Sequence, residues 1–280
     1  MWQVSAPRIL ENIEAKEYEL IVPTCDTKYF EKVTSKSFLI KNDEDYICPK
    51  YRAKLTELLA QRNEFSPNWL IQQFLKIMAI SDGVKGDIAL IWDSDTVPLC
   101  KLSFVDDDSG RLYYYHSDEY HSPYFDTTKR LLGIDRIAPY SFIAQCIPVY
   151  VEWVKLMLEE IEKNCNLPWM EAICTSISGA GNQFSEYETL GNFILSYFPE
   201  FVIFHDNKWE RRGGKYFKTH QKLLNLEKRF LGFDYVALES QDFQKRKYEK
   251  FYEFIRDSLP INLKKNIKSV FRLSRPGKIN

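Results

Sequence analysis

Two aspartates separated by a single residue follow an apolar stretch of strand length. Asp93 and Asp95 close the run DIALIWDSD at residues 87–95, with Ser94 between them. Most Asp-x-Asp pairs are solvated turn residues or helix caps. A strand that delivers two carboxylates to a sheet edge instead suits a hard divalent cation, because Mg²⁺ and Mn²⁺ take oxygen ligands and share the rest with substrate phosphates. The apolar run favours this second interpretation and predicts a metal–phosphate site.

Two further polar stretches follow an apolar segment late in the chain. His205 follows FVIF at residues 201–204, and Arg211 and Lys215 begin and end a loop that starts with Arg-Arg-Gly-Gly. Histidine is the commonest metal ligand, but a histidine at a strand end is as often a packed or surface residue, so both interpretations stay open. Arginine forks and exposed amides grip phosphate, which makes Arg211 and Lys215 candidate contacts to a diphosphate.

A carboxylate in the first turn of a predicted helix is the candidate general base. In the stretch FSEYE at residues 184–188, Ser185 is the expected N-cap and Glu188 the reciprocal half of a capping box. Glu186 is then left free. A carboxylate at this position either offsets the helix dipole or acts as a base aimed at a cleft.

The elements that must position these groups begin with YELIV at residues 18–22, a predicted strand that ends just before Thr24 and Asp26. A second strand is predicted at residues 37–40. The acidic segment that follows is a solvated turn, or it offers Asp43 or Glu44 to a base or ribose hydroxyl. Ligands gather beyond the carboxyl ends of strands in open α/β sheets, so we expect a nucleotide near Thr24 and Asp26.

A helix is predicted directly before the strand that carries Asp93. Ser66 is its expected N-cap and Pro67 its first residue, and the apolar residues that follow recur at helical spacing. Gln73 and Lys76 lie beside the apolar face, so they contact solvent or turn toward a diphosphate. The uninterrupted apolar residues 88–92 predict a strand buried on both faces of a mainly parallel sheet.

The remaining segments predict a binding loop, two helices and a strand. EYHSPYF at residues 119–125 has no simple periodicity, which favours a loop with His121, Tyr124 and Phe125 available to an acceptor. One long helix is predicted over residues 141–162, started or kinked by Pro148. A late strand is expected at residues 233–238 and an amphipathic helix over 242–259.

The composition is that of a globular protein. The chain has 280 residues, of which 45% are hydrophobic and 28% charged, and its net charge is -1. No global field therefore recruits nucleic acid, and no nucleic-acid partner is expected. The six cysteines lack the spacing of a zinc site, so we expect reduced thiols. We predict one domain over residues 1–261 and a basic tail over residues 262–280.

The sequence indicates neither a signal segment nor a membrane span. The first residues include acidic side chains, and no apolar run approaches the roughly 18 residues of a span. The tail interleaves apolar residues with lysines and arginines, which fits an amphipathic segment on an anionic membrane surface or a solvated terminal helix. We expect a cytoplasmic protein, free or peripheral at the inner face of the membrane.

Several of these stretches together resemble the GT-A glycosyltransferases, and more narrowly a group of bacterial glycosyltransferase-like proteins of unknown function found with envelope polysaccharide genes. The resemblance extends to about His205. The matching stretches are YELIVPTCD (18–26), NWLIQQFLKIMA (68–79), LIWDSDTVPL (90–99), EYHSPYF (119–125), KRLLG (129–133), SFIAQ (141–145) and FSEYE (184–188).

This resemblance implies an α/β fold of GT-A-like, Rossmann-related type, with a mainly parallel central sheet flanked by helices. It implies that Asp93 and Asp95 hold Mn²⁺ or Mg²⁺ on the diphosphate of a nucleotide-sugar donor, and that His205 completes the metal site. Thr24 and Asp26 would lie by the nucleotide. The implied activity moves a sugar to a hydroxyl of a glycan or lipid-linked glycan acceptor in bacterial surface polysaccharide synthesis. Glu186 would deprotonate that hydroxyl in an inverting enzyme, or orient a substrate in a retaining one.

Two other classes remain open. A nucleotidyltransferase or other phosphoryl-transfer enzyme shares the metal–diphosphate chemistry, but residues 23–30 lack a glycine-rich basic phosphate motif. A non-catalytic nucleotide- or glycan-binding protein could keep the fold after losing its aspartates, whereas both are present here.

Overall fold

The computed structural model describes residues 1–60, 67–177, 179, 181–206, 208–216 and 226–239. Ser66, the helix predicted over residues 242–259 and the basic tail over residues 262–280 lie outside this set. Among the described residues, no helix combines the length and the apolar character needed to cross a membrane.

A parallel pair of strands joined through a helix opens the fold. The elements are α1 (Trp2–Asn12), β1 (Tyr18–Val22), η1 (Thr24–Asp26), α2 (Thr27–Val33), β2 (Phe38–Asn42), α3 (Asp43–Tyr46) and α4 (Pro49–Ala60). β1 and β2 pair with Tyr18 opposite Phe38. Both strands confirm the prediction, whereas α1 was not predicted. The acidic segment after β2 is the short helix α3, which begins with a capping box between Asn42 and Asp45.

Helices dominate the middle of the chain. The elements are α5 (Pro67–Ser81), β3 (Ile88–Trp92), β4 (Thr96–Pro98), β5 (Leu112–Tyr114), α6 (Ser122–Leu132), β6 (Cys146–Tyr150), α7 (Val151–Cys165), α8 (Trp169–Ser176) and α9 (Glu186–Tyr197). α5 begins at Pro67 and buries Leu70, Phe74 and Ile77, as the helical spacing predicted. β3 likewise confirms the predicted strand before Asp93.

Short elements end the described chain. They are η2 (Pro199–Phe201), β7 (Val202–Phe204), β8 (Trp209–Glu210), η3 (Gly213–Tyr216), α10 (Leu226–Arg229) and β9 (Tyr235–Ala237). β7 and β9 confirm the two predicted late strands. β7 pairs in parallel with β5, and β9 lies between β4 and β8.

The fold is α/β, but the prediction of one mainly parallel central sheet is not met. Within the described residues the strands form small separate ladders, some parallel and some antiparallel. β3 pairs antiparallel with β6, and Ile88 at its start is 38% exposed, so β3 is not buried on both faces. An apolar run of five residues cannot distinguish a fully buried strand from a partly covered one.

The long helix predicted over residues 141–162 is also corrected. Residues 146–150 form β6, and helix α7 begins only at Val151. Pro148 lies inside β6 opposite Leu90. Proline has no backbone N–H and is tolerated on an edge strand, so here it marks a strand rather than a helix start or kink.

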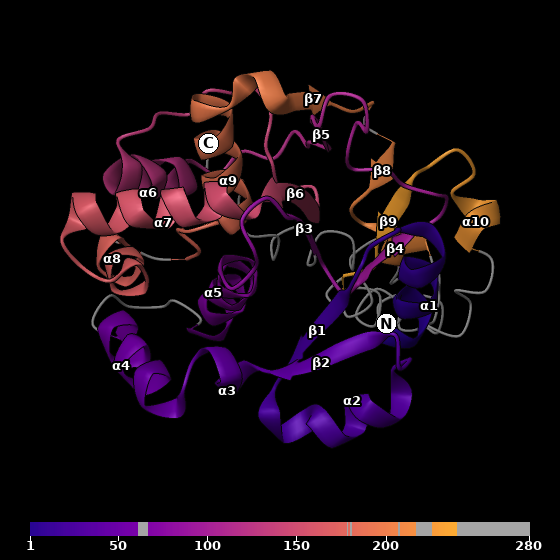
Figure 1. The fold of residues 1–280 in the computed structure, drawn as a ribbon, viewed down its shortest axis with the longest axis horizontal. Helices are drawn as coiled ribbons and strands as arrows, with labels where there is room; N and C mark the ends of the chain where they lie inside the picture. The colour runs from indigo at the N-terminus through magenta and orange to yellow at the C-terminus, as the bar shows by residue number, and fades with distance from the viewer. Residues whose placement is uncertain (61–66, 178, 180, 207, 217–225, 240–280) are drawn as a thin grey trace, which may run out of the picture.

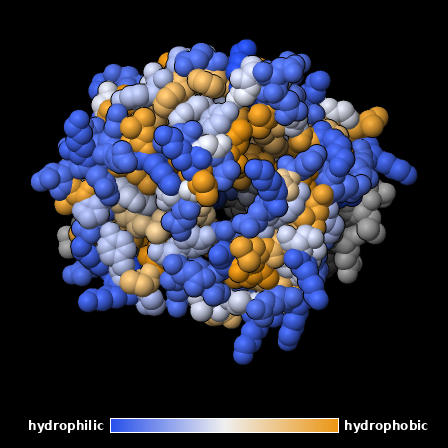
Figure 2. All heavy atoms as spheres, viewed as in Figure 1, coloured by the Kyte–Doolittle hydropathy of each residue, from blue (hydrophilic) through white to orange (hydrophobic). Residues whose placement is uncertain are grey.

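Most of the helices of the middle of the chain lie together on one side of the molecule. Figure 1 shows α4 and α6–α9 on the left, and α1, β4, β8, β9 and α10 on the right. The largest apolar cluster joins α5, α6, α7, α8 and α9 to β6, and a second one joins α1 to β1 and β2. Figure 2 shows this face hollowed near its middle, where Figure 1 places β1 and β3.

Candidate active site

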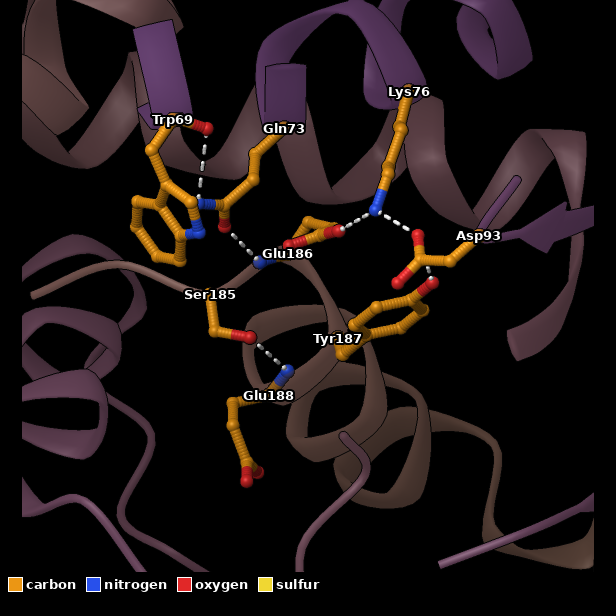
Figure 3. Close-up of polar contacts among 8 residues, drawn as sticks. All are labelled: Trp69, Gln73, Lys76, Asp93, Ser185, Glu186, Tyr187 and Glu188. Carbon is orange, nitrogen blue, oxygen red and sulfur yellow. Dashed lines mark hydrogen bonds and ion pairs between the residues drawn. The ribbon is translucent and has the colours of Figure 1, made fainter. Parts of the chain in front are cut away.

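Asp93 lies at the end of β3 with its side chain held by two donors. Its carboxylate oxygen Oδ1 accepts from Lys76 Nζ at 2.5 Å and from the Tyr187 hydroxyl at 2.9 Å (Figure 3). Its backbone N–H donates to the carbonyl of Gln145 at 3.0 Å, and its carbonyl accepts from the Thr96 N–H at 2.9 Å. The carboxylate is therefore fixed by α5 and α9, and its backbone by the residue before β6.

Lys76 is shared between Asp93 and Glu186. Its Nζ lies 2.7 Å from Glu186 Oε1 and 4.8 Å from the centre of the Tyr187 ring. Burial acts to lower the pKa of Lys76, but the two carboxylates outweigh it and raise that pKa above its ordinary value. The ammonium is therefore charged at neutral pH, and it links α5 to both β3 and α9.

Glu186 occupies the predicted first turn of α9 but is buried, with 3% of its surface exposed. Burial raises the pKa of its carboxyl, and the Lys76 ammonium acts in the opposite direction. Its backbone N–H donates to Gln73 Oε1 at 2.9 Å, so Gln73 caps the start of α9 (Figure 3). The predicted base therefore faces Lys76.

The capping box predicted for α9 is half confirmed. Ser185 Oγ accepts from the Glu188 N–H at 3.3 Å. The Glu188 carboxylate does not return to the N-cap; it accepts instead from the Ser141 hydroxyl and from Asn192 Nδ2. Glu188 thus ties α9 to the segment before β6.

Asp95 lies two residues beyond Asp93 and lacks a cationic partner. Its carbonyl accepts from the Leu238 N–H at 2.9 Å, and no lysine, arginine or histidine of the described chain pairs with its carboxylate. Burial and the charges of Asp93 and Glu239 raise the pKa of Asp95 to about 6, although the charge of Lys76 acts in the opposite direction. The site is therefore richer in negative than in positive charge at this point.

His205 is not brought together with the two aspartates. Its Nδ1 lies 2.9 Å from the carbonyl of Asp206 and 3.8 Å from Asp234 Oδ2, and its ring stacks on Tyr115. Over the part of the chain that the structure describes, no group of three His, Cys, Asp or Glu side chains is arranged for a metal ion. Two carboxylates still fit Mg²⁺ or Mn²⁺, which commonly draw further ligands from phosphates and water.

Arg211, one of the two predicted loop cations, forms ion pairs with two carboxylates. Its Nε lies 2.9 Å from Glu239 Oε1, and its Nη1 pairs with Glu119. Arg211 is thus held by two carboxylates, one of which acts on Asp95. Lys215 lies in η3, whose Gly213 packs closely against β9. Ser94 between the aspartates is exposed, and its carbonyl accepts from Ser5.

Thr24 is tied to the segment after β2, and Asp26 is exposed. The N–H and hydroxyl of Thr24 both donate to Asp43 Oδ1, at 2.9 and 3.0 Å. Arg52 donates to the other oxygen of Asp43 at 2.6 Å. Asp43 is therefore a buried anchor for the end of β1, and the prediction of a solvated turn is wrong for this residue.

The predicted acceptor loop is the start of a packed helix. Tyr124 and Phe125 lie in α6 with 7% and 8% of their surface exposed. Tyr124 stacks on Trp69, and Arg136 lies over the Phe125 ring. His121 precedes α6 and contacts the carbonyl of Asn182 at 2.6 Å. Pro123 near the start and the left-handed Gly133 after Leu132 are the helix signals that could have shown this.

Sequence reasoning did not identify Tyr187 and Gln145 as site residues. Tyr187 contacts Asp93 directly, and Gln145 is a buried residue with a φ of 64° next to the same aspartate. The stretches SFIAQ and FSEYE contain both residues. Both stretches therefore contact Asp93 at the end of β3, and their distance from it along the chain hid this contact from sequence analysis.

Comparisons with known proteins add a family. No curated protein matches the chain in sequence. Among solved structures, the crystal structure of mouse xyloside xylosyltransferase 1 in its apo form is similar, with 10% sequence identity, 86% of this chain and 92% of that chain covered, and a TM-score of 0.45. A model of a family of unknown function, DUF6492, matches residues 11–223, a range that includes Lys76, Asp93, Asp95 and Glu186. The chain therefore belongs to the DUF6492 family.

Proposed function

We propose that the protein is a metal-dependent glycosyltransferase that moves a sugar from a nucleotide-sugar donor to a hydroxyl of a glycan or lipid-linked glycan, in bacterial surface polysaccharide synthesis. The observation that carries the proposal is the pair Asp93 and Asp95 at the end of β3. The first is fixed by Lys76 and Tyr187, and the carboxylate of the second forms no ion pair within the described chain. Three of the other stretches that resemble GT-A enzymes, at residues 68–79, 141–145 and 184–188, contact Asp93.

The charge balance around this pair supports a cation and an anionic donor together. Among the described residues, the three carboxylates Asp93, Asp95 and Glu186 interact with the one ammonium of Lys76. Such an excess of buried or half-buried negative charge is unfavourable unless a cation offsets it. A divalent cation does so and adds affinity for a diphosphate.

The residues of the chain take distinct roles in this proposal. Asp93 and Asp95 would hold Mn²⁺ or Mg²⁺, which offsets charge growing on a departing diphosphate. Lys76 would share that load from the α5 side. Glu186 is buried against Lys76, which favours a positioning role over that of a general base. Thr24 and Asp26 are exposed at the end of β1, where a nucleoside would lie.

The test is a thermal-shift screen of nucleotide sugars and nucleoside diphosphates, with and without Mn²⁺. We expect one nucleotide to raise the melting temperature only with Mn²⁺ present, because a ligand at 100 times its Kd stabilises the native state by about 2.7 kcal/mol. Asp95→Ala should abolish the shift. Asp108→Ala is the matched control, since Asp108 is exposed in a turn away from the network. A wild type that no nucleotide stabilises would contradict the proposal.

Product analysis separates the competing classes. With the stabilising nucleotide sugar, release of a nucleoside diphosphate with transfer of the sugar supports a glycosyltransferase. Release of a sugar 1-phosphate, with transfer of the nucleotidyl group, or of a nucleoside monophosphate, with transfer of the sugar phosphate, indicates a nucleotidyl- or phosphoryl-transfer enzyme. Binding without turnover of any acceptor indicates a binding protein.

A further inference from the structure

Lys76 contacts the same aspartate that the proposed function assigns to a metal ion. Its ammonium occupies Asp93 Oδ1, the oxygen that also accepts from Tyr187, and it does so at 2.5 Å. An aspartate that ligates a metal ion must offer its oxygens to the metal. The contact between Lys76 and Asp93 therefore competes with the cation that the proposed function requires.

Glu186 supplies a second partner that can keep Lys76 in place. Its carboxylate lies 2.7 Å from Lys76 Nζ, and 4% of the side chain is exposed. The helix start that carries it is fixed by Gln73 and Ser185. A buried carboxylate on a fixed helix end cannot follow the lysine outward, and leaving it unpaired is strongly unfavourable. Glu186 thus restrains Lys76 whether or not Asp93 is available.

We propose that Lys76 is an exchangeable counter-ion: it neutralises Asp93 in the metal-free protein and, once Asp93 turns to the metal, pairs with the donor diphosphate while Glu186 holds it in place. This inference rests on the proposed function. It makes Glu186 a positioning residue that acts through Lys76. It also places the charge that meets the diphosphate on α5, next to the end of β3.

The exchange predicts opposite effects of one substitution on two ligands. In Lys76→Met, Asp93 has lost its competing cation, so Mn²⁺ alone should bind about tenfold more tightly, as expected for the loss of one charged hydrogen bond. Pyrophosphate at saturating Mg²⁺ should bind about tenfold more weakly, because the ammonium that pairs with it is gone. Isothermal titration calorimetry measures both, without an identified donor.

Matched variants control for charge and for folding. Lys54→Met removes a lysine of an ion pair with Glu171, in which Nζ and Oε1 lie 2.6 Å apart, outside this network, and should leave both affinities unchanged. Structural damage can only weaken Mn²⁺ binding, so tighter binding by Lys76→Met cannot arise from it. A crystal structure of the wild type with Mn²⁺ and pyrophosphate should place Lys76 Nζ more than about 4 Å from Asp93, beyond ion-pair range, with the contact to Glu186 kept.

The outcomes are distinguishable. Tighter Mn²⁺ binding and weaker pyrophosphate binding in Lys76→Met, with Lys54→Met unchanged, support the exchange. Mn²⁺ binding to Lys76→Met that equals the wild type or is weaker overturns the exchange and leaves the proposed function standing. A wild type that binds no Mn²⁺, with or without pyrophosphate, overturns both.

Discussion

Asp43 and Asp93 are both aspartates that directly follow a strand, yet their surroundings differ. Asp43 follows β2 and has a donor for each oxygen, Thr24 on one and Arg52 on the other. Asp93 follows β3, shares its lysine with Glu186 and stands two residues from Asp95. The charge of Asp43 is balanced by Arg52, and both of its oxygens accept hydrogen bonds. The group around Asp93 holds more negative charge than its own cations neutralise.

This difference separates a structural carboxylate from one that is prepared for a ligand. Burial acts to raise the pKa of Asp43, but the bonds from Thr24 and Arg52 hold it below its ordinary value. Around Asp95, burial and the neighbouring carboxylates act together and raise the pKa to about 6. A carboxylate that the fold stabilises contributes to folding, whereas one that the fold leaves in excess lowers stability until a cation arrives.

Asparagine substitutions of Asp43 and of Asp95, the unpaired neighbour of Asp93, should give the largest difference in stability between the two regions. Asp43→Asn should lower the free energy of unfolding by about 2 kcal/mol, because a charged hydrogen-bond acceptor is lost and Arg52 keeps a weaker partner. Asp95→Asn should raise it by about 1 kcal/mol without metal, because one of several like charges is removed. Urea unfolding with a common m-value measures both.

The prediction is that the two substitutions change the free energy of unfolding in opposite directions. If both variants are destabilised to a similar degree, Asp95 has a structural partner of its own, and the excess of negative charge does not lower the stability of the protein in solution. If Asp43→Asn is neutral, the end of β1 is held by other contacts.

The contribution of Asp43 to the free energy of unfolding should depend on pH, which distinguishes it further from Asp95. The folded-state pKa of Asp43 lies below the unfolded value of about 3.9, so the folded state binds fewer protons and stability rises with pH in that range. Its contribution is fully present above the unfolded pKa and is lost as pH falls through the folded one. The difference in unfolding free energy between wild type and Asp43→Asn should therefore shrink by about 1 kcal/mol on acidification from pH 5 to pH 3.

Urea unfolding at several pH values measures this difference. Arg52→Met keeps the carboxylate but removes its cation, so it should show part of the same loss. A difference that stays constant with pH would mean that the charge of Asp43 is not what stabilises the segment.

Local sequence signals predicted the elements on which the site stands. Pro67 and the helical spacing after it gave α5, and the apolar run gave β3 with its two aspartates. The N-cap role of Ser185 was also readable, because the cap depends on residues within one turn. These are features that neighbouring residues determine.

Long-range contacts were not predictable in the same way. Asp43 looked like a solvated turn residue because its partners Thr24 and Arg52 lie on other elements. Tyr187 reads as one more aromatic, because its partner Asp93 lies 94 residues away along the chain. The apolar residues of the segment over 141–162 fit the periodicity of a helix as well as that of a strand, and one helix was predicted there. Only the pairing with β3 makes residues 146–150 a strand.

The smallest expected effect concerns the backbone beside Asp93. Gln145 has a left-handed φ of 64°, and its carbonyl holds the Asp93 N–H at 3.0 Å. A residue with a Cβ is disfavoured there and glycine is not, so Gln145→Gly should be more stable than Gln145→Ala by about 1 kcal/mol. Asn166, with a φ of 53° at the end of α7, is the matched position and should show the same order.

The expected effect of these substitutions on Mn²⁺ binding is opposite to their effect on stability. Glycine relieves the strain by freeing the backbone that fixes Asp93, so Gln145→Gly should bind Mn²⁺ more weakly than Gln145→Ala although it is the more stable of the two. The Asn166 pair should bind it equally, since α7 ends away from the aspartates. If Gln145→Ala equals or exceeds Gln145→Gly in stability, the left-handed backbone is not retained in solution. The Asp93 end of the fold would then resemble the Asp43 end in its backbone and differ from it only in charge.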